Sequence, residues 1–370
     1  MMKAFLSAMG RTKADYRLAH FILLLHIASM CGLAWYLEVE PYYRTGTFYL
    51  RLSLTAMLVY ASCYLLWTVL RFLIEQREQP TAALIKHIRD VLIRGDRYAH
   101  ALHSMVIFTG MITVFATIKS TIPAINPFSW DTVLIEVDRA IFGGVDPYVL
   151  TSAAFGNAYA IVVINFFYNL WLILVACSLV WAAWTSNHFL RLRFMFAALL
   201  GWLVAGNICA IAFSSVGPCF LEPLTGDRTY APLMQLLEQV NSETGLVWAL
   251  TAQKGLWVAY TSESGAISGI SAMPSLHVVF AVTIACLTWR MGHFPRWAGT
   301  GFAVIIAIGS VQLGWHYASD GIVGGALALL FWKISGYLAS WSLDHTSPVL
   351  EPAQAAADCP SQQIALQVGD

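Results

Sequence analysis

Eight long apolar runs follow one another along this chain of 370 residues, and short interruptions separate most of them. A helix needs roughly 20 apolar residues to cross the hydrocarbon core of a bilayer. Most of the runs approach or exceed this length, so the sequence predicts an all-α fold, a polytopic membrane helical bundle of about eight transmembrane helices. The sixth run is short, and we expect its helix to begin a few residues earlier. The runs cover residues 18–37, 52–74, 101–118, 159–184, 194–216, 276–289, 297–315 and 321–341.

The composition narrows the class of partner. Only 11% of the residues are charged, whereas soluble domains carry about 25%. The net charge is +0 at pH 7, which argues against a nucleic-acid partner because binding to a phosphate backbone needs a strongly basic surface. We therefore expect membrane lipids as the surroundings and partners. The seven cysteines form no disulfide framework and no metal-spaced pair.

Lysines and arginines divide unevenly between the two sets of loops that eight spans create. The set that includes both termini holds fifteen of the 21 basic residues. Because basic residues are enriched on the cytoplasmic side of a membrane, we expect both termini to be cytoplasmic. The two longest loops, 119–158 and 217–274, then face the periplasm, the cell exterior or an organelle lumen. The opposite set holds only Arg44, Arg51, Lys119, Arg139, Arg228 and Lys254.

Two histidines stand at the expected outer ends of neighbouring spans, where ionisable residues tend to mark function. His277 closes the stretch Met-Pro-Ser-Leu-His at the start of the sixth span, and His316 follows the seventh span. Asp320 comes four residues after His316, a spacing that places the carboxylate beside the imidazole on a helical turn. A carboxylate in that place fixes the ring tautomer and raises the basicity of the ring. The pattern favours a nucleophilic histidine held by an aspartate.

Two such histidines fit phosphoryl transfer through a covalent phosphohistidine. His316 would attack phosphorus, and His277 would protonate the leaving oxygen and then activate the incoming hydroxyl. Ser275, just before a helix start, would offer its hydroxyl and nearby backbone N–H groups to phosphate oxygens. This chemistry needs no metal and no cofactor. A metal site of His277, His316 and Asp320 is the alternative by ligand type, but no further ligand stands at typical spacing.

A lone histidine at a membrane interface is more often a packed or anchoring group than a catalyst. His277 and His316 differ from such residues because they share one expected side of the membrane at the ends of neighbouring spans. This conjunction favours a functional interpretation of the pair. We assign a structural role to the other histidines near span ends, His20, His26, His100 and His103.

Met273-Pro-Ser-Leu-His277 and His316-Tyr-Ala-Ser-Asp320 resemble the second and third signature motifs of the phosphatidic acid phosphatase type 2 superfamily, which includes lipid phosphatases, glucose-6-phosphatase and vanadium haloperoxidases. Within this superfamily, the Pro-Ser-Leu-His stretch most resembles the branch of inositol phosphorylceramide synthases and their bacterial relatives. The enzymes of this branch are inositolphosphotransferases. The resemblance covers about residues 119–326 and implies a six-helix bundle in which His316 is the nucleophile, Asp320 its partner and His277 the acid. Other stretches similar to that branch are Ile122-Pro123, Pro127-Phe128, Asp131, Asp138-Arg139, Phe142-Gly143 and Gly217-Pro218-Cys219-Phe220.

Both usual phosphate-binding cations of the superfamily are missing from their places. An arginine usually stands six residues before the nucleophilic histidine, where this chain has Ser310. The first motif, a lysine followed by Arg-Pro, is replaced near the end of the fifth span by Gly217-Pro218. A phosphate still needs neutralisation. Lys119, at the exit of the third span, is the first candidate, followed by Arg228 and Lys254.

We expect three parts in the chain. Residues 1–100 would hold two transmembrane helices and a cytoplasmic loop, and residues 101–342 a six-helix catalytic core with outer-side loops. Residues 343–370 are polar and without periodicity, which is typical of a disordered tail. In the second long loop, apolar residues recur at helical spacing over 231–240 and predict a helix that lies on the membrane surface or packs as a lid.

The functional hypothesis is a membrane enzyme that acts on a lipid phosphate at the outer leaflet. Transfer of a phospho-headgroup, as in inositol phosphorylceramide synthases of sphingolipid metabolism, is preferred. The first alternative is a phosphatidic acid or polyprenyl phosphate phosphatase, in which water replaces the acceptor alcohol. A lipid transporter or flippase is the second, although the sequence lacks the internal repeats common in transporters. A purely structural membrane protein is the third.

Overall fold

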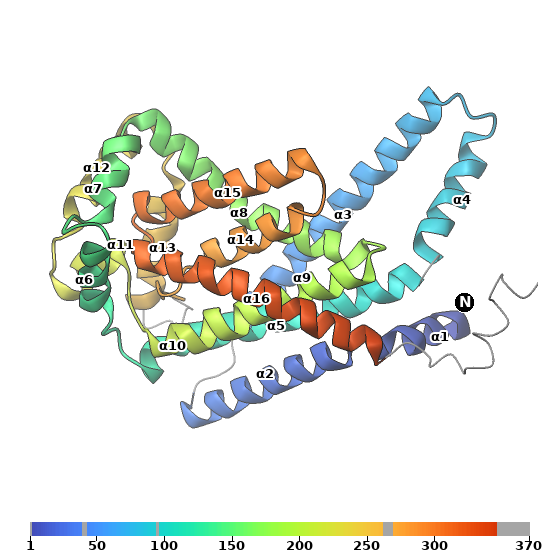
Figure 1. Cartoon of the computed structure of the whole chain (residues 1–370), viewed down its shortest axis with the longest axis horizontal. Helices are drawn as coiled ribbons and strands as arrows, with labels where there is room; N and C mark the ends of the chain where they lie inside the picture. The colour runs from blue at the N-terminus through green and yellow to red at the C-terminus, as the bar shows by residue number, and fades with distance from the viewer. Residues whose placement is uncertain (1, 39–42, 94–95, 262–268, 346–370) are drawn as a thin grey trace, which may run out of the picture.

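The computed structural model describes residues 2–38, 43–93, 96–261 and 269–345, and throughout these residues the regular structure is helical, without a strand (Figure 1). The predicted all-α fold is thereby confirmed. In chain order the elements are α1 (Met2–Thr12), η1 (Lys13–Tyr16), α2 (Arg17–Tyr36), α3 (Tyr43–Ile74), α4 (Pro80–Ile93), α5 (Arg97–Ile125), α6 (Asp131–Ile141), α7 (Pro147–Phe155), α8 (Ala158–Trp184), α9 (His188–Leu200), η3 (Gly201–Cys209), α10 (Ala210–Ala212), α11 (Pro218–Thr225), α12 (Ala231–Thr244), α13 (Trp248–Thr261), α14 (Leu276–Thr288), α15 (His293–Gln312) and α16 (Ala318–Asp344).

Seven helical segments among the described residues are long and apolar enough to cross a membrane. They coincide with seven of the eight apolar runs. The prediction of an integral, multi-pass membrane protein is therefore confirmed. One of the eight apolar runs, the sixth, does not form a helix of spanning length. The seven are Leu6–Tyr36, Met57–Ile74, Arg97–Ile125, Ala158–Trp184, His188–Ala212, His293–Gln312 and Ala318–Asp344.

The sixth run forms α14, which has only 13 residues. At 1.5 Å per residue the helix is about 20 Å long, well short of a hydrocarbon core of about 30 Å. The expectation of an earlier start is wrong, because Ser275 has an extended backbone (ψ 106°) and its side chain caps the helix by accepting a hydrogen bond from the Val278 N–H. Pro274 directly precedes it. The short helix can be accommodated because α9, α15, α16 and η3 pack around it.

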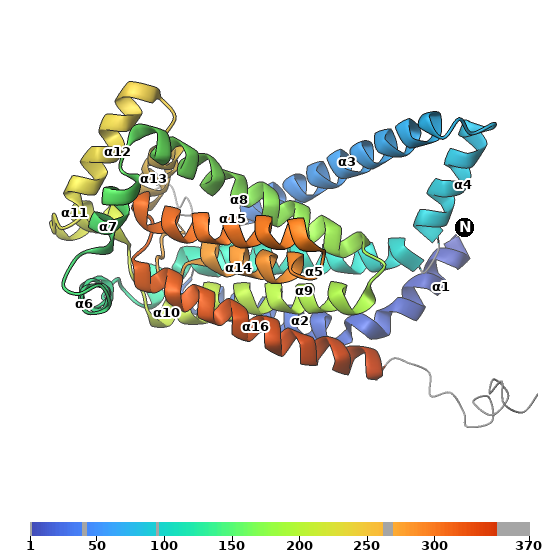
Figure 2. The ribbon, with the colours of Figure 1, turned by 45° about the horizontal axis from the view of Figure 1, so that its top comes forward.

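Most of the long helices run side by side, and the short helices of the two longest loops gather at one end of the bundle (Figure 2). Helices α6, α7, α11, α12 and α13, which come from the two longest loops, lie at that end, whereas α1 and the last turns of α16 lie at the other (Figures 1 and 2). Helix α12 covers the stretch predicted as helical. Helix α16 continues to Asp344, and the tail expected to be disordered lies outside the described residues from 346 onward.

The interior and the surface are both apolar, as expected where lipid is the solvent. Phe194, Phe196 and Phe280 are fully buried in the central cluster formed by α5, α9, α14 and α16. On the outside, Leu24 and Leu329 are 64% and 59% exposed. Such side chains gain nothing by exposure to water but are accommodated in a hydrocarbon phase.

Candidate active site

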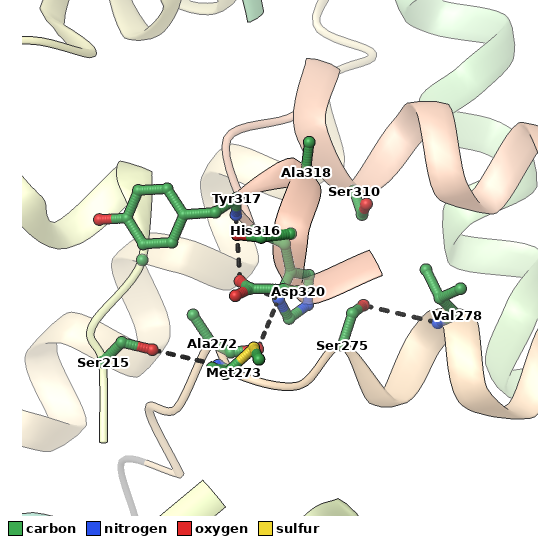
Figure 3. A network of polar contacts seen from close by, with 12 residues as sticks. Ser215, Ala272, Met273, Ser275, Val278, Ser310, His316, Tyr317, Ala318 and Asp320 are labelled. Atoms are coloured by element: carbon green, nitrogen blue, oxygen red, sulfur yellow. Dashed lines mark hydrogen bonds and ion pairs between the residues drawn. The ribbon is translucent and has the colours of Figure 1, made fainter. Parts of the chain in front are cut away.

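His316 lies in the turn between α15 and α16, and its neighbours hold both its backbone and its ring (Figure 3). The backbone N–H donates to the Ser310 carbonyl oxygen at 2.9 Å. The ring nitrogen Nδ1 lies 2.8 Å from the carbonyl oxygen of Ala272 and 3.3 Å from Oδ2 of Asp320. The side chain is buried, at 7% exposure. The imidazole is thus held by contacts from two distant parts of the chain.

These contacts assign the tautomer of His316. A backbone carbonyl oxygen only accepts hydrogen bonds, so Nδ1 must carry a proton to bond with Ala272. The neutral ring then bears its lone pair on Nε2. A nitrogen in this form can act as a nucleophile, and a carboxylate in the place of Asp320 can stabilise positive charge on the ring.

Asp320 is fully buried, and the first turn of α16 holds it in place. Its Oδ2 accepts a hydrogen bond from the Tyr317 N–H at 3.0 Å, as part of a capping box at the start of the helix. The Asp320 carbonyl oxygen accepts from the Ser275 N–H at 3.1 Å. This bond joins the residues before α14 to those at the start of α16.

His277 lies on the first turn of α14 and faces the same region. Its ring centroid is 6.1 Å from that of His316. The ring stacks on Tyr168 at 4.5 Å and lies 4.3 Å from Trp171, both on α8. The indole N–H of Trp171 donates to the His277 carbonyl oxygen at 2.9 Å. The structure therefore brings together His277, His316 and Asp320, the three residues singled out as catalytic from the sequence.

A cavity of about 780 Å³ opens beside the two histidines, between α5, α8, η3 and α14. Lys119 on α5 lines it, with its ammonium group 5.9 Å from the centroid of the Phe115 ring. Among the described residues that line the cavity, Lys119 is the only lysine or arginine, and none is an aspartate or glutamate. Most of the others are apolar or aromatic. The cavity thus combines an apolar surface with one cation and two imidazoles.

The other proposed phosphate-binding residues do not line this cavity. The hydroxyl of Ser275 is buried and acts as the helix cap of α14. Arg228 is exposed and pairs with Glu222, with 3.0 Å between Nε and Oε1. Lys254 on α13 is exposed as well. Lys119 is therefore the one predicted cation that the structure places beside the histidines.

Two buried carboxylates on α6 accept hydrogen bonds from residues next to His316, and the sequence motifs alone did not predict these contacts. Asp131 accepts hydrogen bonds from the N–H groups of Val216 and Gly217 and, at 2.8 Å, from the Tyr317 hydroxyl. Asp138 accepts from the N–H groups of Ala318 and Ser319, both at 2.8 Å. Only the resemblance had singled out these aspartates. Their spacing of seven residues, which places both on one face of a helix, was the available signal.

Burial shapes the electrostatics of these contacts. It raises the pKa of Asp138, and the hydrogen bonds from Ser319 and Ala318 oppose that rise. Burial and the neighbouring Asp131 raise the pKa of the Tyr317 phenol far above its ordinary value. Tyr317 is therefore a permanent hydrogen-bond donor to Asp131 at physiological pH.

A family model described as the PAP2 superfamily matches residues 132–334, which is more than half of the chain. The match contains His277, His316 and Asp320 but not Lys119 or Asp131. No curated protein and no solved structure matches the chain. The chain belongs to the PAP2 superfamily, as its motifs indicated, and its members are generally phosphatases or phosphotransferases.

Proposed function

Starting from this membership, we propose that the protein is a lipid phosphotransferase that works through a phosphohistidine on His316. It would move a phospho-headgroup from a donor lipid to the hydroxyl of an acceptor lipid, in the manner of inositol phosphorylceramide synthases. The observation that carries the proposal is the environment of His316. Its Nδ1 is engaged by Ala272 and Asp320, so the nucleophilic Nε2 remains for a substrate in the adjoining apolar cavity.

The first step forms a bond between Nε2 of His316 and phosphorus and breaks the bond between phosphorus and the oxygen of the donor's diacylglycerol. A proton from His277 goes to the departing alkoxide, which leaves as a neutral alcohol. In the second step His277 takes the proton of the acceptor hydroxyl, whose oxygen attacks phosphorus and breaks the phosphorus–nitrogen bond. Both histidines end in their starting states, so the cycle balances without a metal.

The charges around the cavity support a phosphodiester donor. A phosphodiester carries one negative charge, and Lys119 offers one positive charge in its ammonium form. A phosphomonoester carries up to two negative charges. Elsewhere in the superfamily these charges are neutralised by the cationic residues of two motifs that this chain lacks. Apolar side chains such as Ile112, Leu172 and Val175 line the remaining wall and suit acyl chains.

The excess of lysine and arginine in the loops that include the termini supports an outward-facing site. His316 directly precedes α16, whose first turn is bonded to α6, whereas α1 and the last turns of α16 lie at the opposite end of the bundle (Figure 1). With cytoplasmic termini, the histidines act at the outer leaflet.

The test uses the full chain in liposomes with a phosphatidylinositol that carries ³²P in its headgroup and ceramide as acceptor. We expect labelled product lipid from the wild type and none from His316→Ala. When the wild-type reaction is stopped after a short time, the protein itself should carry a label that is labile in acid and stable in alkali. His293→Ala is the matched control, since His293 is exposed at the opposite end of α15. Full activity of His316→Ala would exclude this mechanism. Release of label only into water would assign a phosphatase, and lipid movement without turnover would assign a transporter.

A further inference from the structure

Three side chains that can ligate a metal lie together at the end of the bundle near α1, away from the proposed catalytic residues. The potential ligand atoms of Asp15, His100 and His188 all lie within 4.8 Å of one another. The rings of the two histidines are nearly perpendicular (86°), and their centroids are 4.5 Å apart. The three residues come from different elements, because Asp15 belongs to η1, His100 to the first turns of α5, and His188 begins α9.

We propose that Asp15, His100 and His188 bind one divalent transition-metal ion, with Zn²⁺ as the best fit. Two imidazole nitrogens and one carboxylate oxygen are a usual zinc ligand set, and they leave a fourth tetrahedral position for water. Ca²⁺ and Mg²⁺ prefer sites made of oxygen ligands. Sequence reasoning assigned His100 a structural role. In the fold, Asp15 and His188, which are 85 and 88 residues away from His100 in the chain, lie beside it and complete a set of three potential metal ligands.

The second coordination sphere is already present around His100. Its Nδ1 lies 3.1 Å from the Tyr16 hydroxyl, and that hydroxyl lies 3.3 Å from the His100 carbonyl oxygen. If the hydroxyl donates its single proton to the carbonyl, it accepts one from Nδ1. That arrangement leaves the lone pair of His100 on Nε2, the nitrogen free to ligate. A hydrogen bond on the opposite ring nitrogen is the usual support of a histidine ligand.

The other two ligands have their coordinating atoms free. Among the described residues, no hydrogen bond or ion pair engages the carboxylate of Asp15 or the ring nitrogens of His188. Both side chains are partly exposed, so an ion can enter from solvent. An unpaired carboxylate beside two imidazoles is an arrangement that a cation stabilises.

Arg191 is the main opposing charge, since it is buried close to the same residues. One of its terminal nitrogens, Nη2, donates to the Thr185 carbonyl oxygen. No ion pair within 4.0 Å joins it to Asp15 in the described part of the chain. The carboxylate of Asp15 is therefore not paired with the guanidinium of Arg191 in the described part of the chain. The positive charge of Arg191 lowers the affinity for a cation, and the ionised carboxylate offsets that effect.

The ion would fasten the N-terminal helices to the rest of the bundle. Asp15 and His100 precede the part of the chain that matches the PAP2 superfamily, and His188 lies within it. Binding would thus cross-link a segment outside the family match to the core. Its contribution is to stability, and it is independent of the phosphohistidine chemistry proposed for His316.

The experiment uses the full-length protein in detergent, stripped with a chelator and titrated with ZnCl₂ against a chromophoric zinc indicator. We expect one Zn²⁺ per chain and a Tm that rises with zinc concentration, whereas Mg²⁺ leaves the Tm unchanged. His188→Gln removes one ligand and weakens binding at least about tenfold. His20→Gln is the matched control, because His20 lies at the same end but contacts His103, at 3.0 Å. It should bind zinc as the wild type does.

Three outcomes would overturn the proposal. One is a folded wild type that binds no zinc, and another is undiminished binding by His188→Gln. The third is an equal loss in His20→Gln, which would assign the ion to the His20 and His103 pair. Asp15→Asn provides a second variant, expected to lose the rise in Tm with zinc. If it fails to fold, His188→Gln decides alone, since His188 is partly exposed and its ring makes no hydrogen bond among the described residues.

Discussion

Asp138 and Ser319 are 181 residues apart in the chain, yet Oδ1 of the aspartate accepts a 2.8 Å hydrogen bond from the serine N–H. The other carboxylate oxygen accepts from the Ala318 N–H. The Asp138 side chain thus bonds to two N–H groups at the start of α16 that have no partner within the helix. Asp320 satisfies a third at Tyr317. The helix that carries the partner of His316 is therefore capped from α6 as well as from itself.

Asp138→Ala should lower both stability and turnover. It leaves two buried N–H groups without partners, which costs about 2–3 kcal/mol of unfolding free energy. We also expect turnover to fall, because the turn that carries His316 loosens. Denaturant titration and the headgroup-transfer assay measure the two effects. Glu136→Ala, an exposed position on the same helix, should stay within about 0.5 kcal/mol of the wild type. Equal behaviour of the two variants would contradict the bracing role.

Asp320→Asn should reduce turnover by about 100-fold and leave KM near the wild-type value. The amide oxygen can still accept from the Tyr317 N–H, and Ala272 still orients the ring through Nδ1. In the proposed mechanism, the variant loses the negative charge that would stabilise the positive charge on the phosphorylated ring. We therefore expect a smaller loss than for His316→Ala. Asp344→Asn, exposed at the far end of α16, is the control. A wild-type rate for Asp320→Asn would refute the assignment.

Lys119→Met should raise KM for the donor lipid about tenfold or more, because a charge-assisted contact to phosphate is worth roughly 1.5–3 kcal/mol. Lys119→Arg keeps the positive charge and should recover part of the affinity. Steady-state kinetics with the phosphatidylinositol donor measure both variants. Lys254→Met removes an exposed lysine that does not line the cavity and should leave KM unchanged. If both methionine variants behave alike, Lys119 does not bind the phosphate.

Gly217→Ala should destabilise the protein by more than Gly226→Ala. Both glycines have positive φ, 87° and 78°. At Gly217 a Cβ atom would lie 2.8 Å from the Trp315 carbonyl oxygen, whereas at Gly226 nothing lies within 4 Å. The backbone conformations differ as well, because Gly217 (ψ 164°) lies in a region that is essentially restricted to glycine, whereas Gly226 (ψ 0°) lies in the left-handed helical region, where a side chain costs about 1–3 kcal/mol. The difference in unfolding free energy between the two variants therefore combines the stricter backbone requirement at Gly217 with its close approach to the turn that carries His316, and equal values would contradict the prediction.

Much of the bundle could be predicted from local patterns. A span is a property of one continuous stretch, so seven apolar runs became long helices. The pairing of His316 with Asp320 is also local, although His316 stands before α16 rather than on a helical turn, and Asp320 reaches its ring from the first turn of that helix. The start of α14 was misjudged, since Pro274 and the Ser275 cap ended the helix where hydropathy alone would have extended it.

What the sequence by itself determined is the membrane bundle, the superfamily and the pairing of His316 with Asp320, because each depends on neighbours along the chain. Only the tertiary structure decided that Ala272 fixes the tautomer of His316, that Asp138 caps α16, and that Lys119 rather than Arg228 lines the cavity. Each of these contacts joins residues from separate elements. Their geometry depends on how the helices pack across the bundle, and hydropathy and residue spacing along the chain do not predict that packing.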